Sequence, residues 1–258
     1  MGDITSYIDL AQVCLYLFFA FFIGLVLYLR REDKREGYPL LSDRSGLVRV
    51  QGYPTIPKPK SFRTPEGHVS YAPETTKEIP RPGLRPTAPW PGAPLTPTGN
   101  PLVDGVGPAA WANRQDEPEM TWEGEPAIVP LSIVDGTFVE PRDRNPIGMP
   151  VFAADKVRAG TVTEIWTDRS EPQIRYLEVE LASAAGAAGR RVLLPMGFAI
   201  IDTRRGYVTT NTLYAHQFAD VPALKNDRQI TKLEEDKITG YFAGGLLYAT
   251  PARLEPLL

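Results

Sequence analysis

The chain has 258 residues, with 28 lysines and arginines against 31 aspartates and glutamates, and a formal net charge of -3. Nucleic-acid binding needs a basic face, so this charge balance argues against a nucleic-acid partner. The single cysteine, Cys14, excludes an internal disulfide and any paired-cysteine metal or redox motif. The length allows one membrane helix and one or two compact regions.

An uncharged apolar run, LAQVCLYLFFAFFIGLVLYL, occupies residues 10–29. A helix of this length is about 30 Å long, which matches the hydrocarbon core of a bilayer. A cleaved signal peptide is disfavoured, because Asp3 and Asp9 lie where such peptides are basic. A buried core helix would rarely be so uniformly apolar. We therefore predict one transmembrane helix.

Basic residues follow this run and none precedes it: Arg30, Arg31, Lys34 and Arg35. The positive-inside rule places such a flank in the cytoplasm. We therefore expect a periplasmic N-terminus and a cytoplasmic location for most of the chain.

Proline divides the remainder, since 20 of the 26 prolines lie between residues 51 and 150. Proline cannot donate a ladder hydrogen bond or sit inside a helix, so we expect an extended segment rather than a helical bundle or regular sheet. Composition alone admits a disordered linker. Interleaved aromatic residues such as Tyr53, Phe62 and Trp90 favour instead a chain laid over another protein. The residues alone leave both alternatives open.

Short strands separated by glycine-rich or charged turns are predicted after about residue 125, at 127–134, 160–166, 174–181, 191–195 and 206–212. In the third, Leu177 and Val179 share one face while Tyr176 and Glu178 share the other. This alternation predicts a half-buried antiparallel strand. The series as a whole predicts a small antiparallel barrel or sandwich.

One cytoplasmic helix is predicted near residues 231–244. Thr231 and Glu234 have the spacing of a capping box, in which each side chain satisfies the backbone amide of the other residue. Gly244 and Gly245 are expected to end the helix, because glycine readily adopts the left-handed conformation of a helix stop.

The expected fold is a single N-terminal transmembrane α-helix plus a mainly-β cytoplasmic domain with one C-terminal α-helix. The expected boundaries follow the chain: a periplasmic N-terminus at 1–9, the transmembrane helix at 10–30, the proline-rich extended segment at 31–110, the β domain at 111–248 and a tail at 249–258.

Catalytic motifs are missing from the sequence, which has no nucleophile elbow, zinc-protease helix or phosphate-binding glycine loop. The two histidines, His68 and His216, are isolated. We therefore expect no enzyme, no metal site and no cofactor-binding residues. Carboxylates of the β domain could pass protons if a membrane partner buried them, because burial raises their pKa towards neutrality.

Five blocks resemble the H subunit of the purple-bacterial photosynthetic reaction centre in their order along the chain: YLRREDKREGYPL (28–40), PTGNPLVDGVGPAAW (97–111), NPIGMPV (145–151), RYLEVE (175–180) and LEEDKITGYFAGGLLYATP (233–251). The resemblance implies one transmembrane helix, an ordered segment lying on partner subunits and a cytoplasmic PRC-type β-barrel.

The function implied by this resemblance is that of a non-catalytic subunit of a light-driven electron-transfer complex. Such a subunit caps the cytoplasmic face of the L and M subunits, stabilises the quinone region and assists proton transfer to the secondary quinone. The partner subunits would hold bacteriochlorophyll, bacteriopheophytin, quinones, non-haem iron and carotenoid. Membrane lipids are expected contacts, and a cytochrome subunit and a light-harvesting antenna are left open. The implied location is the bacterial inner, intracytoplasmic photosynthetic membrane.

The turn WTDRSEPQIRY (166–176) resembles the family segment that carries proton-path residues. The resemblance assigns that role to Asp168, Glu171 and Arg175. Glu171 would respond to charge on the reduced quinone, and Arg175 would limit the rise of its pKa. Glu235 is a further candidate.

Some family members have paired histidines just before the strand that corresponds to AIVPLSIV. Here the segment reads TWEGEPAIVP, with Glu123 and Glu125 in that region. Proton uptake through histidine, and inhibition by transition metals there, is therefore not expected. We expect Glu123 and Glu125 to gather protons instead.

Two other functions compete with this reading. A membrane-anchored PRC-barrel adaptor would dock a soluble partner rather than pigment-bearing subunits. A membrane-tethered enzyme is disfavoured by the missing motifs.

Overall fold

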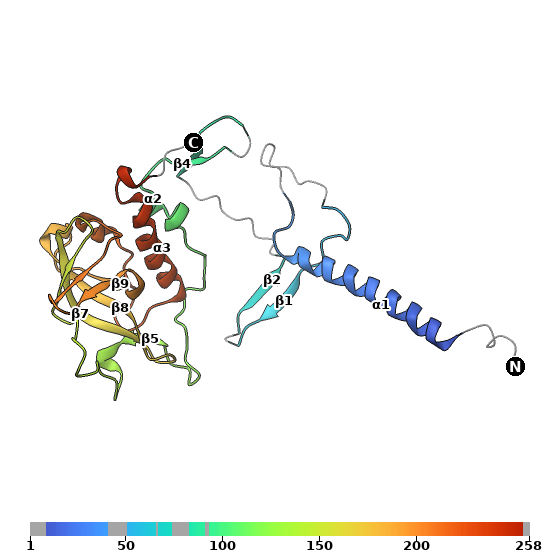
Figure 1. The fold of residues 1–258 in the computed structure, drawn as a ribbon, viewed down its shortest axis with the longest axis horizontal. Coiled ribbons are helices and arrows are strands. Elements are labelled where there is room, and N and C mark those ends of the chain that lie inside the picture. Colours follow the sequence, from blue (N-terminus) through green and yellow to red (C-terminus); the bar gives the residue numbers. More distant parts are fainter. Residues whose placement is uncertain (1–8, 41–50, 66, 74–82, 91–92, 255–258) are drawn as a thin grey trace. The chain divides into compact units, whose positions relative to one another are not determined.

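The computed structural model describes residues 9–40, 51–65, 67–73, 83–90 and 93–254. The chain divides into two units (Figure 1). The first comprises Met1–Pro80 and Ala88–Pro94, and the second comprises Arg81–Thr87 and Leu95–Leu258.

The first unit begins with α1 (Leu10–Glu32), which confirms the predicted apolar helix. Asp9 caps it, since its carboxylate accepts a hydrogen bond from the amide of Ala11 at 3.0 Å. None of the helix residues is buried within the chain, and its length and composition suffice to cross a membrane. A core helix of a soluble protein would instead bury one face. A 3-10 turn (Asp33–Arg35) follows directly.

Lys34 ties the end of α1 to a later part of the same unit. Its buried ammonium group donates to three backbone carbonyl oxygens, those of Gln51 at 2.6 Å, Gly52 at 3.1 Å and Pro54 at 2.6 Å. The ring of Tyr38 lies 5.2 Å away. All three donors of the ammonium group are thereby satisfied, so the buried charge is accommodated without a carboxylate.

The neighbouring Arg35 binds Glu32 through two hydrogen bonds, at 2.8 and 3.0 Å, and also donates to backbone carbonyls of the hairpin region. That hairpin pairs β1 (Lys60–Arg63) with β2 (Val69–Ala72). The expectation that the proline-rich segment contains no regular sheet is therefore wrong for these residues. Proline is compatible with it here because β1 and β2 contain none.

The second unit has a further short hairpin and a single larger sheet. The hairpin pairs β3 (Leu84–Pro86) with β4 (Leu95–Pro97), and α2 (Pro101–Asp104) follows it. The strands of the larger sheet are β5 (Ile128–Pro130), β6 (Pro150–Phe152), β7 (Arg158–Asp168), β8 (Gln173–Leu181), β9 (Arg191–Pro195), β10 (Ile200–Asp202) and β11 (Tyr207–Thr209).

The mainly-β domain is confirmed, but the sheet does not close within the part of the chain that the structure describes. Its strand order is β10-β11-β6-β7-β8-β9, with β5 paired to β7. The pair β11–β6 is parallel, against the antiparallel expectation. This pairing aligns Val208 with Val151, and both side chains are fully buried. Apolar alternation predicts which residues are buried but not the direction of the neighbouring strand.

The prediction that β8 is half-buried is wrong, because Tyr176 and Glu178 are also buried. The Glu178 carboxylate accepts hydrogen bonds from the indole of Trp166 at 3.2 Å and the hydroxyl of Thr163 at 3.0 Å. It also lies 3.5 Å from the guanidinium of Arg191. These partners allow a charged residue to leave water.

The C-terminal helix α3 (Lys232–Tyr248) lies against the sheet, near β9 (Figure 1). Its capping box is confirmed: the Glu234 amide donates to the Thr231 hydroxyl at 3.2 Å, and the Thr231 amide donates to the Glu234 carboxylate at 2.9 Å. The predicted stop at Gly244 and Gly245 is wrong, since the helix runs on to Tyr248.

These glycines instead permit close approach. A Cβ atom on Gly244 would lie 2.5 Å from the Cβ of Ala109, and one on Gly245 would lie 2.7 Å from the carbonyl oxygen of Thr212. Such distances are too short for carbon in a folded interior. The glycines therefore set how closely α3 approaches its neighbours.

We predict that Gly244→Ala lowers the free energy of unfolding by about 1 kcal/mol, because overpacking costs about 2 kcal/mol and the helix preference of alanine over glycine offsets about 1 kcal/mol of it. Urea unfolding of the full chain in detergent, followed by tryptophan fluorescence, measures the change. Gly197→Ala is the control, since a Cβ there meets nothing within 4 Å. A Gly244→Ala chain as stable as the parent would contradict this account of the glycines.

Candidate functional site

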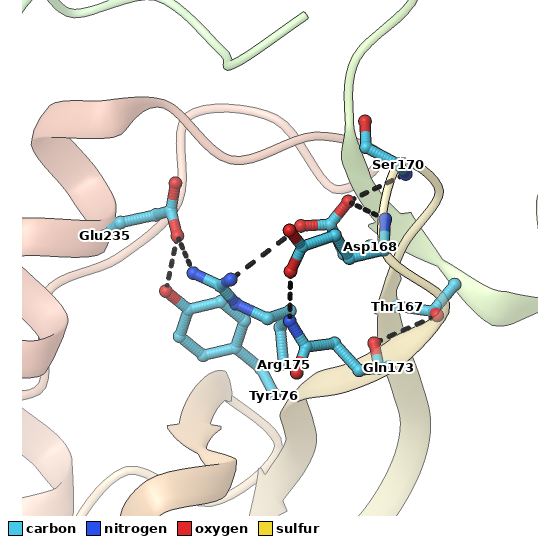
Figure 2. Close-up of polar contacts among 8 residues, drawn as sticks. Thr167, Asp168, Ser170, Gln173, Arg175, Tyr176 and Glu235 are labelled. Carbon is cyan, nitrogen blue, oxygen red and sulfur yellow. Dashed lines mark hydrogen bonds and ion pairs between the residues drawn. The ribbon is translucent and has the colours of Figure 1, made fainter. Parts of the chain in front are cut away.

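Ionisable side chains from three elements meet where β7 ends and β8 begins (Figure 2). The guanidinium of Arg175 lies 3.7 Å from a carboxylate oxygen of Asp168 and 3.5 Å from Oε2 of Glu235. The hydroxyl of Tyr176 donates to the same Oε2 at 2.9 Å. Asp168 comes from β7, Arg175 and Tyr176 come from β8, and Glu235 comes from the first turn of α3. We call these four residues the acid cluster.

A β-bulge in β8 directs the consecutive side chains of Arg175 and Tyr176 to the carboxylate of Glu235. Trp166 aligns with Tyr176 and Thr167 aligns with Ile174, so the register shifts around Arg175. Consecutive residues of a regular strand point to opposite faces, whereas a bulge redirects a side chain. Arg175 and Tyr176 can therefore both reach Glu235.

Asp168 is held by backbone amides as well as by Arg175. One of its carboxylate oxygens accepts from the amide of Ser170 at 2.8 Å and from the amide of Glu171 at 3.3 Å. This is the arrangement by which aspartate stabilises a tight turn. Only 7% of the residue is exposed, so its contacts are largely shielded from water.

Opposing effects act on the pKa of Glu235. Desolvation by burial raises it above the ordinary glutamate value, and the hydrogen bond from Tyr176 and the charge of Arg175 act in the other direction. The negative charges of Glu119 and Asp168 add to the rise. Burial also raises the pKa of Tyr176, so its hydroxyl remains a hydrogen-bond donor at neutral pH.

Glu171 lies beside the acid cluster with an exposed side chain. Its carboxylate accepts a hydrogen bond from the side-chain amide (Nε2) of Gln173 at 3.3 Å. Among the residues described, the ion pairs of Arg175 go to Asp168 and Glu235. The structure thus places Arg175 against Glu235, whereas the expected influence of Arg175 on Glu171 stays a prediction.

The acidic segment before β5 forms a tight turn. The amide of Thr121 donates to the carbonyl of Glu125 at 2.7 Å, and Glu123 is exposed. Glu125 forms an ion pair with Arg169, which directly follows Asp168 in the chain. Surface cavities of about 440 Å³ and about 470 Å³ are both lined by Glu125 and Arg169. Glu125 therefore lies near the turn of Asp168, and Glu123 takes no part in the acid cluster.

Sequence reasoning missed Tyr176, because it assigned that side chain to the polar face of a half-buried strand. The bulge that redirects Arg175 leaves no signal in the residue pattern. The sequence predicted that Glu235 lies in the first turn of a capped helix, but it did not predict how close Glu235 lies to β8. Within the ranges given above, no group of three or more side chains is arranged to hold a metal ion.

Comparison with protein-family models gives two matches. The model described as "Photosynthetic reaction centre, H-chain N-terminal region" matches residues 2–133, just over half of the chain. The model described as "PRC-barrel domain" matches residues 139–217. The first match includes α1, Glu123 and Glu125, and the second includes β6 to β11. Glu235 lies outside both matched ranges.

Glu235→Gln should make the free energy of unfolding less dependent on pH. Burial raises the pKa of Glu235 in the folded state, so its contribution to stability is full below the unfolded pKa and is lost as pH rises through the folded pKa. Glutamine does not titrate, and it keeps an oxygen acceptor for Tyr176. Urea midpoints from mildly acidic to mildly alkaline pH test this. Glu180→Gln is the control, because Glu180 is an exposed glutamate on β8 and lies outside the acid cluster. Parallel pH profiles for the parent and Glu235→Gln chains would contradict the prediction.

Proposed function

Because the chain belongs to the photosynthetic reaction centre H-chain family, we propose that it caps the cytoplasmic face of the L and M subunits, stabilises their quinone region and assists proton transfer to the secondary quinone. Family membership makes it a membrane-anchored subunit that associates with other reaction centre subunits. The observation that carries the proton-transfer proposal is the acid cluster.

A group that takes up and releases protons near neutral pH needs a pKa close to the working pH. Glu235 moves in that direction, because burial raises its pKa while Arg175 and Tyr176 keep the ionised form accessible. Asp168 contacts the same guanidinium at 3.7 Å. The negative charge of Asp168 also adds to the rise in the pKa of Glu235, after the larger effect of burial.

The exposed residues near this cluster support a path from solvent. Glu171 is exposed beside Asp168, and Glu125 pairs with Arg169 between two surface cavities. We propose that Glu123 and Glu125 collect protons where other family members use histidine. Four further residues then carry protons or control their passage: Asp168, Glu171, Arg175 and Glu235.

The first unit has the surface expected of a segment that covers a partner. Tyr53 is 81% exposed and Trp90 is 63% exposed, and both would lose water on contact with another subunit. The side chains of α1 are available to lipid. We propose that the pigments, quinones and non-haem iron are held by the L and M subunits.

Orientation of α1 rests on its basic flank. Arg30 and Arg31 occupy the last turn of the helix, and no lysine or arginine precedes it. We propose that the N-terminus is periplasmic and that the second unit is cytoplasmic, in agreement with the positive-inside rule.

Glu235→Gln and Glu171→Gln should each slow proton-coupled reduction of the secondary quinone by at least about tenfold while the complex still assembles, since each removes a carboxyl group from the proposed path. Flash-induced proton uptake and quinone reduction in the purified reaction centre measure the effect. Glu180→Gln should behave like the parent, because Glu180 is exposed on β8 and outside the acid cluster. Normal proton uptake in both test variants would remove these carboxyls from the path.

Labelling with a membrane-impermeant maleimide tests the orientation. In a Cys14→Ala background, Asp227→Cys places a thiol on an exposed part of the second unit, and Asp9→Cys places one before α1. We expect Asp9→Cys to react in spheroplasts and Asp227→Cys to react only in inside-out vesicles. The reverse pattern would mean that the chain is inserted the other way round.

A further inference from the structure

Glu235 receives two contacts at the same oxygen atom. Tyr176 donates to Oε2 at 2.9 Å, and the guanidinium of Arg175 lies 3.5 Å from that oxygen. In Figure 2 both side chains approach Glu235 from β8. Among the residues that the structure describes, neither contact goes to Oε1, so the two oxygens of the carboxyl group are not equivalent.

The hydroxyl of Tyr176 cannot readily exchange this partner for water. Tyr176 is 3% exposed, and a buried hydroxyl left without an acceptor is unfavourable. Thr239 is the second hydrogen-bond partner of this hydroxyl and favours its ionised form, as a donor does, so Glu235 is left as the acceptor for the Tyr176 proton whether its carboxyl is ionised or protonated. An added proton goes to the oxygen that is not already accepting from a buried donor.

We propose that Tyr176 is a positioning residue: its hydroxyl holds Oε2 of Glu235, so that this carboxyl group binds and releases its proton at Oε1. Nothing in the sequence pattern or the family matches assigns this role to Tyr176. The functional role given to Tyr176 rests on the proposed proton-transfer function. The hydrogen bond between Tyr176 and Glu235 does not depend on that function.

Burial is the largest cause of the raised pKa of Glu235, and residues on neighbouring elements add to it or oppose it. Arg175 and Tyr176 on β8 favour the ionised carboxylate, while Asp168 on β7 and Glu119 in the preceding segment disfavour it. On α3 itself, Glu234 is turned to the amides of Thr231 and Lys225, and Asp236 pairs with Arg114. Removing the Tyr176 hydroxyl therefore removes one of the two groups that stabilise the ionised carboxylate of Glu235.

Infrared difference spectra of the assembled reaction centre across a pH titration test the proposal. The carboxylic C=O band that disappears in Glu235→Gln identifies Glu235. In Tyr176→Phe, which keeps the ring, the midpoint of this band should move to higher pH, because the ionised form loses a donor. A fluorinated tyrosine at position 176 is a stronger donor and should move the midpoint to lower pH.

Tyr241→Phe is the matched control. Tyr241 is equally buried, and its hydroxyl donates at 2.8 Å to the carbonyl of Gln217, away from Glu235. The proposal is overturned if Tyr176→Phe leaves the midpoint unchanged, or if Tyr241→Phe moves it as far. If Tyr176→Phe alone moves the midpoint while Glu235→Gln leaves proton uptake normal, the positioning role stands and the proton-transfer function of Glu235 fails.

Discussion

Close approach of α3 to its neighbours is the constraint on which the second unit depends. Gly240, Gly244 and Gly245 bring the helix against Ala109 and Leu213 at distances that no side chain would allow. A helix held further out would carry Glu235 away from Tyr176 and Arg175, because Glu235 lies in the first turn of the same helix. The close packing of these glycines thus determines whether Glu235, at the N-terminal end of α3, reaches Tyr176 and Arg175.

The contact of Glu235 with Arg175 and Tyr176 is fixed by the backbone, and it brings a positive and a negative side chain together. The bulge in β8 directs Arg175 and Tyr176 to one carboxylate, and the turn after β7 holds Asp168 on the other side of the same guanidinium. Burial raises the pKa of Glu235, and the shared cation of Arg175 and the hydrogen bond from Tyr176 oppose that rise. In the function proposed above, this arrangement is how the chain would influence a reaction of its partner subunits.

Patterns that depend on neighbours in the chain were predictable, and those that depend on distant neighbours were not. The apolar helix and the capping box of Thr231 and Glu234 follow from local spacing, and both were confirmed. The burial of Glu178 depends on Trp166 and Arg191, which approach it across the sheet. The role of Gly244 depends on Ala109, far away in sequence. Asp168, Arg175 and Glu235 were identified by resemblance, whereas their shared contact required the fold.

Lys34 is both a basic residue next to the apolar helix and a buried residue of the folded chain. As one of the basic residues after α1, it adds to the charge asymmetry that orients a helix during membrane insertion. In the folded chain its ammonium group is buried and bound by the carbonyls of Gln51, Gly52 and Pro54. Arg30 and Arg31 remain exposed, so these two side chains of the basic flank stay available to anionic lipid headgroups. A single charge can serve first as a signal for insertion and afterwards as an internal tie between the anchor and the chain that follows it.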